Sequence, residues 1–426
     1  MKKKTKLLFA SIAALTALVW PAEAQTYDTN NDFVETFAGY GIPGYVDGQG
    51  QFTAFSSPSQ IVADTSGNLY VWDSGNSRIR KITADGTVST LAGGGSYFEG
   101  YGTNVSLAWG TGGTLAMDHA NTLWLVLAGG YNNYDNSYLV TIGTNGFVSI
   151  ANAGLTNLGA ASGLCFDSAN NLYYSGGNRI YRYSSATGAS QAFAGSGIAG
   201  NFDGQGVLFS AFNNPGALAC DQADNLYVFD AGNVTIRRID KNQNVTTVAG
   251  NDYSYYQNSD GVGTNATFYG GVASMFADHQ GNLYFVCGDC IRKMNVQTNV
   301  VTLAGVFSQY GAAFANGPGY QARFSSAAGG CISQGTVFIA DTGNHRIRSI
   351  TFNPEAQIVP PANLQLNTYP GLQITGTIGR SYQIQSSPNL NAWTPVATLL
   401  LNSSPYLWFD QNPVAGNKFY RAVLLP

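Results

Sequence analysis

The chain has 426 residues, of which 44% are hydrophobic and only 10% are charged, and its formal net charge at pH 7 is -4. Ordinary globular proteins carry about 25% charged residues. Nucleic-acid binding without sequence preference needs clustered Lys and Arg, so this sparse and mildly acidic composition argues against a nucleic-acid partner. The length predicts about two domains.

The first 24 residues have the pattern of a secretory signal peptide. Four Lys residues lie between residues 2 and 6, an apolar run covers residues 7–20, and small residues at Ala22 and Ala24 suit a cleavage site. The apolar run is too short to span a bilayer. We therefore expect residues 1–24 to be removed and the mature protein to be secreted or periplasmic, without a membrane span.

One sequence motif recurs six times between residues 33 and 352. Its first copy joins DTSGNLYVWD (residues 64–73), RIRKI (residues 78–82) and VSTLAG (residues 88–93). Each copy predicts four short strands, because apolar and polar residues alternate between turns rich in Gly and Asn. A strand repeat of this size is typical of a propeller or a solenoid.

The two ends of the repeated region complement each other. The sixth copy runs from Ile350 into Asn353 and Pro354 without the closing VSTLAG-like segment, whereas VETFAG occurs at the other end, over residues 34–39. This offset favours a closed ring, which leaves no sheet edge unpaired. We predict an all-β fold with a six-bladed β-propeller over residues 33–352, closed by the N-terminal strand.

The fourth copy carries a family resemblance. Its segments DGQG (residues 203–206), NLYVFD (residues 225–230), IRRI (residues 236–239) and TVAG (residues 247–250) follow one another in the order of an NHL repeat. The repeated region as a whole resembles the NHL-repeat propellers of bacterial exported proteins. The resemblance implies the propeller fold and does not by itself imply an activity.

The repeat stops after residue 352. Pro360 and Pro361 indicate a linker over residues 353–361, and short alternating segments then run over residues 362–426. These segments predict a small β-sandwich. They resemble the fibronectin-like C-terminal modules of exported bacterial proteins, with aromatic residues at Tyr382, Trp393, Phe409 and Phe419. That resemblance implies attachment or targeting.

Candidate catalytic groups are scarce. The chain has three histidines, His119, His279 and His345, which the repeat places too far apart for a shared metal or proton relay. Two GxGxxG matches, at residues 39–44 and 195–200, lack the following helix that a dinucleotide site needs. The strands expected nearest the axis are apolar. We predict no catalytic residue, no metal centre and no cofactor.

Two recurring charged positions each allow two interpretations. The Asp-Gly-x-Gly turns suit either weak calcium binding or plain turn formation, and their carboxylates are Asp47, Asp203 and Asp260. A basic residue recurs on the predicted third strand, where it either pairs with a neighbouring blade or recognises an anion. These residues are Arg80, Arg237, Arg292 and Arg348.

The five cysteines fall into two groups. Cys165, Cys220 and Cys331 precede the turn of their repeats and are predicted to be small buried residues. Cys287 and Cys290 flank a Gly-Asp turn. In an oxidising compartment, that spacing makes a local disulfide between them a reasonable expectation.

The loops in which the six copies differ are the predicted binding surface. Exposed Tyr and Asn combine apolar contact with polar tips, which suits protein or sugar recognition. The candidates are Tyr131, Asn132, Asn133, Tyr134, Tyr253, Tyr255, Tyr256, Asn344, His345 and Arg346. We predict a non-catalytic binding protein for a protein or glycan partner. The alternative is a metal-dependent hydrolase or lyase of lactonase type on the same scaffold.

Overall fold

The structure is a computed structural model of the chain. It describes residues 32–108, 113–127, 138–153, 162–184, 187–251, 258–307, 313–352, 363–366, 372–402, 404, 406–408 and 419–425. The predicted signal peptide and linker lie outside these residues, as do the binding candidates between 131 and 134 and between 253 and 256. Within the described part of the chain, no helix is long and apolar enough to cross a membrane.

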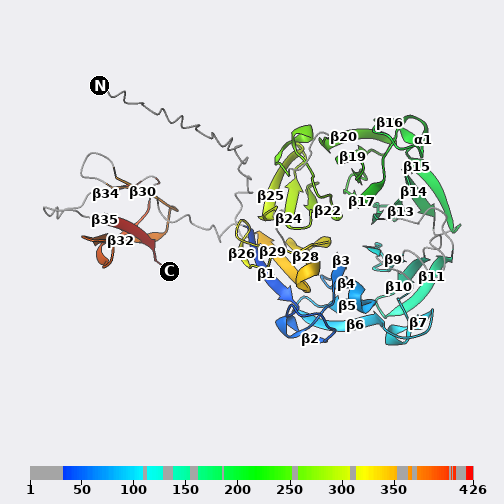
Figure 1. Ribbon diagram of the computed structural model, residues 1–426, viewed down its shortest axis with the longest axis horizontal. Helices are drawn as coiled ribbons and strands as arrows, with labels where there is room; N and C mark the ends of the chain where they lie inside the picture. The colour runs from blue at the N-terminus through cyan, green and yellow to red at the C-terminus, as the bar shows by residue number, and fades with distance from the viewer. Residues whose placement is uncertain are drawn as a thin grey trace, which may run out of the picture.

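Antiparallel sheets of four or five strands form almost all of the structure up to residue 352 (Figure 1). Sheet 1 has the order β2-β6-β5-β4-β3 and consists of β2 (Gly48–Gln49), β3 (Pro58–Ala63), β4 (Leu69–Asp73), β5 (Arg78–Ile82) and β6 (Thr87–Gly93). Sheet 2 has the equivalent order and consists of β7 (Gly100–Tyr101), β8 (Thr114–Met117), β9 (Leu123–Leu127), β10 (Tyr138–Ile142) and β11 (Phe147–Ala153).

Sheets 3 and 4 follow the same plan, although sheet 3 has four strands among the described residues. Sheet 3 consists of β12 (Leu164–Phe166), β13 (Leu172–Gly176), β14 (Arg179–Ser184) and β15 (Ala189–Ala194). Sheet 4 consists of β16 (Gly204–Gln205), β17 (Pro215–Cys220), β18 (Leu226–Asp230), β19 (Thr235–Ile239) and β20 (Asn244–Gly250).

Sheets 5 and 6 complete the repeated region. Sheet 5 consists of β21 (Gly261–Val262), β22 (Ser274–Ala277), β23 (Leu283–Val286), β24 (Cys290–Met294) and β25 (Asn299–Gly305). Sheet 6 consists of β1 (Asp32–Ala38), β26 (Gly317–Pro318), β27 (Gly329–Ser333), β28 (Thr336–Asp341) and β29 (Arg346–Phe352). Single helical turns join some strands: η1 (Gly50–Phe52), η2 (Ser74–Asn76), η3 (Gly102–Asn104), α1 (Gly206–Phe209), η4 (Gly263–Asn265) and η5 (Thr342–Asn344).

The N-terminal strand β1 lies in the sheet of the last repeat. It pairs antiparallel with β29, with Val34 opposite Ile350 and Thr36 opposite Arg348. The order of sheet 6 is β26-β1-β29-β28-β27, so β1 takes the place that β6 takes in sheet 1. Strand pairing therefore joins the two ends of the repeated region.

The six sheets lie around a common axis, with one strand of each nearest the centre (Figure 1). These inner strands are β3, β8, β12, β17, β22 and β27, and each contacts the next, with β27 against β3. Buried apolar clusters fill the spaces between consecutive sheets. One cluster lies between sheet 6 and sheet 1, where Ala38 and Ala340 pack with Phe55 and Val71.

Steric hindrance explains why glycine ends the repeated motif. Gly93 has a φ of +99°, and a Cβ atom there would lie 2.4 Å from the Ser77 carbonyl oxygen. Gly250 and Gly305 have the same conformation and the same kind of close backbone contact. Only glycine adopts this backbone and allows the close approach without strain, which explains why Ala-Gly recurs at this point.

The C-terminal residues form two three-stranded antiparallel sheets. One contains β30 (Asn363–Leu366), β31 (Leu372–Thr375) and β34 (Tyr406–Trp408), and the other contains β32 (Ser381–Ser387), β33 (Thr394–Leu400) and β35 (Phe419–Leu424). Both sheets contribute to one buried cluster, which includes Ile374, Tyr382 and Ile384. The resemblance to fibronectin-like modules remains a prediction.

Candidate functional site

A cavity of ≈ 320 Å³ lies where the inner strands meet. All six inner strands line it, mostly with Ala, Leu, Ile, Val and Met side chains. No Asp or Glu is part of this lining, and the described residues contain no group of three or more His, Cys, Asp or Glu that could hold a metal ion. Its polar side chains include His119, the amide of Gln60, the hydroxyl of Thr114 and three thiols.

Each histidine contacts the sheet next to its own. His119 Nε2 lies 2.8 Å from the carbonyl oxygen of Asp167, and His279 Nδ1 contacts the amide of Gln222. His345 Nδ1 accepts a hydrogen bond of 3.0 Å from the backbone N–H of Ser57. The three rings lie in separate places and serve contacts between sheets, in agreement with the wide separation that the repeat predicts.

In the first five repeats an Asp organises the first turn. Asp64 accepts hydrogen bonds from the backbone and side chain of Asn68 and from the hydroxyl of Tyr70. Burial alone would raise the pKa of Asp64, but the hydrogen bonds from Asn68 and Tyr70 outweigh it and hold the pKa below 3.8. The same contacts recur at Asp167, Asp221 and Asp278, whereas Asp118 accepts from the backbone of Thr122 and the indole of Trp124.

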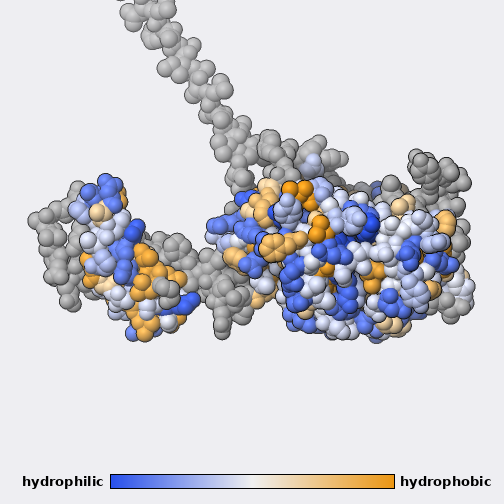
Figure 2. All heavy atoms as spheres, turned by 90° about the horizontal axis from the view of Figure 1, so that it is seen from below, coloured by the Kyte–Doolittle hydropathy of each residue, from blue (hydrophilic) through white to orange (hydrophobic). Residues whose placement is uncertain are grey.

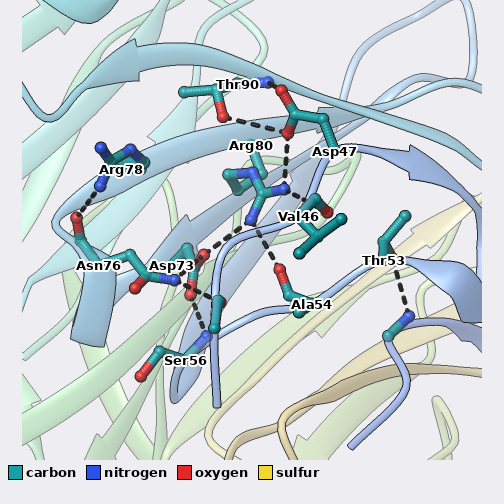
Figure 3. Close-up of polar contacts among 12 residues, drawn as sticks. Val46, Asp47, Thr53, Ala54, Ser56, Asp73, Asn76, Arg78, Arg80 and Thr90 are labelled. Carbon is teal, nitrogen blue, oxygen red and sulfur yellow. Dashed lines mark hydrogen bonds and ion pairs between the residues drawn. The ribbon is translucent and has the colours of Figure 1, made fainter. Parts of the chain in front are cut away.

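Arg80, on β5, is fully buried and lies at the opposite end of the strands from the Asp64 turn. Figure 3 shows its polar contacts. Arg80 Nη2 is 2.7 Å from Asp47 Oδ1, and Arg80 Nη1 is 3.0 Å from Asp73 Oδ2. The guanidinium also donates to the carbonyl oxygens of Val46 and Ala54 at 3.1 and 2.9 Å. The sequence-based expectation of pairing with a neighbouring blade is therefore wrong, because both carboxylates belong to sheet 1 and its own crossover. The guanidinium is also not free to bind an anion, because it already contacts two carboxylates and two carbonyl oxygens.

The same site recurs with graded changes. Arg237 is paired with Asp203 at 2.6 Å and with Asp230 at 2.9 Å, and Arg348 is paired with Asp341 at 2.7 Å. Arg292 is paired with Asp260 at 3.0 Å, and Cys287 occupies the strand position that corresponds to the second Asp. The three Asp residues considered as calcium ligands, Asp47, Asp203 and Asp260, are thus all paired with guanidinium groups.

Cys287 and Cys290 are both buried and both have free thiols. A hydrogen bond from Cys290 lowers the pKa of Cys287, and the positive charge of Arg292 acts in the same direction, although burial opposes both. The predicted disulfide between them stays a prediction. Cys331 is buried as expected, and burial raises the pKa of its thiol. Cys165 and Cys220 differ from the expectation because both are only half-buried.

The predicted binding residues Asn344, His345 and Arg346 make contacts inside the chain. Asn344 Nδ2 donates to the Ala313 carbonyl oxygen at 2.9 Å, and Arg346 Nη2 donates to the Tyr40 carbonyl oxygen at 2.7 Å. The equivalent residues Asn76 and Asn233 donate in the same way to Gly44 and Gly200. Gly-Asn recurs in this turn of several repeats, and that recurrence in the sequence indicates a structural role for the Asn.

Each crossover, the segment between two sheets, changes direction along its length. In residues 39–57, Gly44 lies beside Asn76 in the turn after β4, whereas Gly50 N donates to the Gly86 carbonyl oxygen in the turn after β5. Those turns are at opposite ends of the strands. The crossover therefore starts at one end of the ring and then follows the outer edge of the next sheet, which differs from the single loop face that the sequence predicted.

Exposed apolar side chains mark the first part of the crossovers. Sequence reasoning missed them, because the GxGIxG segments that carry Ile42 and Ile198 were interpreted only as turns. We call this set the crossover face; it consists of Tyr40, Ile42, Tyr45, Val46, Tyr97, Ile198 and Phe202, whose exposed fractions run from 52% for Val46 to 75% for Ile198. On the side of the molecule drawn in Figure 2, apolar surface lies in patches among polar ones.

The comparison with known proteins agrees with a β-propeller repeat architecture. No protein-family model matches the chain. The chain is 26% identical over 330 residues to Protein SUPPRESSOR OF QUENCHING 1, chloroplastic, of Arabidopsis thaliana, a match that covers 74% of this chain and 26% of that protein. The chain thus spans about a quarter of the length of this curated relative.

Similar solved structures come from Bacteroides. A structural genomics protein of unknown function from Bacteroides thetaiotaomicron has a TM-score of 0.59 and 19% identity, covering 75% of this chain and 76% of that chain. An auxiliary nutrient binding protein from the same organism has a TM-score of 0.55 and 19% identity, with the same coverage. One from Bacteroides ovatus has a TM-score of 0.56 and 16% identity, covering 75% and 76%. At such identities the similarity shows the fold alone.

Proposed function

We propose that this chain is an exported, non-catalytic β-propeller of NHL type that binds a protein partner through the crossover face. In this proposal the six sheets are six blades, and β1 closes the ring. Pairing of β1 with β29, contact of β27 with β3 and the apolar cluster between sheets 6 and 1 support the closure. The signal-peptide pattern of residues 1–24 supports export.

The exposure of the crossover face is the observation that carries the binding function. Ile42 and Ile198 occupy equivalent positions of two crossovers and are 56% and 75% exposed. Contiguous exposed apolar side chains mark interaction surfaces, and Tyr40, Ile42, Tyr45 and Val46 lie close together within one crossover. Aliphatic Ile and Val beside Tyr and Phe favour a protein over a sugar, because sugars are usually bound by aromatic rings and polar groups. One structural neighbour is a nutrient binding protein, which supports a binding role in general terms.

A hydrolase or lyase would need different chemistry at the axis. A catalytic metal in such an enzyme is held by carboxylates or imidazoles. The described lining of the axial cavity supplies one imidazole, from His119, and no carboxylate. That imidazole already contacts the Asp167 carbonyl oxygen. No specific contact therefore favours the enzyme alternative over binding.

Photo-crosslinking tests this function directly. A benzophenone amino acid at position 42 should label one protein of the source organism, whereas the same group at position 296 should not. Val296 is a matched control, because it is 62% exposed but lies in the turn after β24, at the opposite end of the strands from the turn after β23. Equal labelling from both positions, or specific binding to a glycan array instead of a protein, would contradict the proposal.

A further inference from the structure

Two thiols from neighbouring sheets meet at the wall of the axial cavity. Cys165 belongs to β12 in sheet 3, and Cys220 ends β17 in sheet 4. Their Sγ atoms lie 2.9 Å apart, and both side chains are half-buried and line the cavity. Cys331 lines the same cavity from sheet 6 but is buried. The cavity therefore presents one thiol pair and one separate thiol.

The separation of the two sulfurs places them close to bonding distance. A disulfide bond is about 2.0 Å long, so the two Sγ atoms need to approach each other by roughly 1 Å. Side-chain rotation about the Cα–Cβ bonds can supply movements of this size. β12 and β17 are already in contact, so the two cysteines lie on strands that pack against each other.

We propose that Cys165 and Cys220 form a reversible disulfide between sheets 3 and 4, made by thiol–disulfide exchange with a small disulfide that enters the axial cavity. The cavity of ≈ 320 Å³ gives such a molecule access to the thiol pair. Neither the predicted binding function nor the hairpin pair Cys287 and Cys290 involves these two residues.

Glutathione disulfide can serve as the oxidant, and with it the exchange conserves atoms and electrons. The Cys165 thiolate attacks one sulfur of glutathione disulfide, forms a mixed disulfide and releases one glutathione thiolate. Cys220 then loses its proton to solvent, attacks Cys165 Sγ and releases the second glutathione. The two cysteines are oxidised by two electrons, and one glutathione disulfide is reduced to two glutathione thiols.

The environment of the pair supports this order of attack. The hydrogen bond to Cys165 raises the pKa of Cys220, and burial and the nearby carboxylates of Asp167 and Asp221 act in the same direction. Cys220 therefore keeps its proton in the reduced protein. A thiolate is the nucleophile in exchange, so we assign Cys220 the second step, its attack on the mixed disulfide.

Of sheets 1 to 6, the bond would act on the one with the fewest strands among the described residues. Among the described residues, sheet 3 has four strands where the others have five, and its inner strand β12 has three residues. Cys165 and Cys220 are separated by 55 positions in the chain. A link across a loop of that length restricts the unfolded chain strongly, so we expect the melting temperature to rise on the order of 5 °C.

The test uses the full mature chain, reduced and then incubated with glutathione disulfide. Free thiols are blocked with iodoacetamide, and the protein is digested without reductant and examined by mass spectrometry. We expect a cross-linked peptide pair that contains Cys165 and Cys220, with Cys331 alkylated after unfolding. The melting temperature of the oxidised protein should rise by the amount given above, and dithiothreitol should reverse it.

Variants separate this pair from the others. Cys287→Ser with Cys290→Ser should leave both the cross-link and the rise in melting temperature unchanged, and Cys331→Ser should do the same. Cys165→Ser and Cys220→Ser should each abolish both. Recovery of Cys165 and Cys220 as separate alkylated residues would overturn the proposal, as would a stable mixed disulfide of Cys165 with glutathione that does not proceed to the cross-link.

Discussion

Arg80 and Asp73 form an ion pair of 3.0 Å in which neither side chain is exposed to solvent. Equivalent fully buried pairs join Arg237 to Asp230 and Arg348 to Asp341. Burial raises the pKa of each of these Asp residues, although hydrogen bonds and the adjacent guanidinium act in the opposite direction. Arg80 also pairs with Asp47 and donates to the carbonyl oxygens of Val46 and Ala54, so this buried pair connects the middle of the crossover to β5 of sheet 1.

Replacing Arg80 by Met should destabilise the fold by about 3–5 kcal/mol, because Asp73 would remain buried without its partner. Chemical denaturation at pH 7 measures this loss. Arg78→Met on the same strand is the matched control, and its cost should stay below about 1 kcal/mol, since Arg78 is partly exposed and donates to one backbone carbonyl. Equal costs for the two variants would contradict the role assigned to the buried pair.

Asp64→Asn should reduce stability by about 1–2 kcal/mol at pH 7 through lost hydrogen bonds. The pKa of Asp64 is lower in the folded protein than its ordinary value of 3.8. The folded state therefore binds fewer protons than the unfolded state just below that value, and the stabilisation present at neutral pH is lost as the pH falls through 3.8 and below. Unfolding curves from pH 7 to pH 2.5 should show the variant and the natural chain converging. The exposed Glu35→Gln is the control, and a difference that widens in acid would refute the assignment.

Calcium should have no effect on the propeller. Asp47, Asp203 and Asp260 are each paired with a buried guanidinium, at 2.7, 2.6 and 3.0 Å. A bound cation would stabilise the folded state in proportion to the logarithm of its concentration. Melting curves recorded with EDTA and with millimolar calcium should therefore coincide. A melting temperature that rises steadily with calcium would show that the crossover carboxylates bind the ion after all.

Removing residues 25–38 should lower the melting temperature on the order of 10 °C. The deletion takes β1 out of sheet 6 and leaves the edge of β29 unpaired. It also removes Val34 and Ala38 from the apolar clusters on the two sides of that sheet. A shorter deletion of residues 25–31 keeps β1 and serves as the control. If both deletions melt at the temperature of the mature chain, β1 does not close the ring.

The sequence predicted the β architecture because the repeat is strong. The missing segment after Ile350 and its copy around Val34 together predicted their pairing, and the structure places those two residues opposite each other. The pairing of Arg80 with Asp47 was harder to predict, since 33 positions separate the two residues. It depends on the return of the crossover along the edge of its own sheet, which no local pattern encodes.

Proximity between side chains of different sheets was not predictable. Cys165 lies two positions before the turn Asp of its repeat and Cys220 one position before, so a simple alternation of strand faces would point them in different directions. The packing of β12 against β17 brings them together instead. The crossover face was missed for a related reason, because a turn signal says nothing about how far Ile42 or Ile198 extends into solvent.

Affinity for the cross-linked partner tests the central claim, binding through the crossover face, most directly. Isothermal titration should give a Kd at least tenfold higher for Ile42→Ser combined with Ile198→Ser, a loss of about 1.4 kcal/mol or more, with the melting temperature unchanged. Val296→Ser, at an equally exposed site in the turn after β24, should bind as the natural chain does. An unchanged Kd for the folded double variant, or an equal loss for Val296→Ser, would contradict the account.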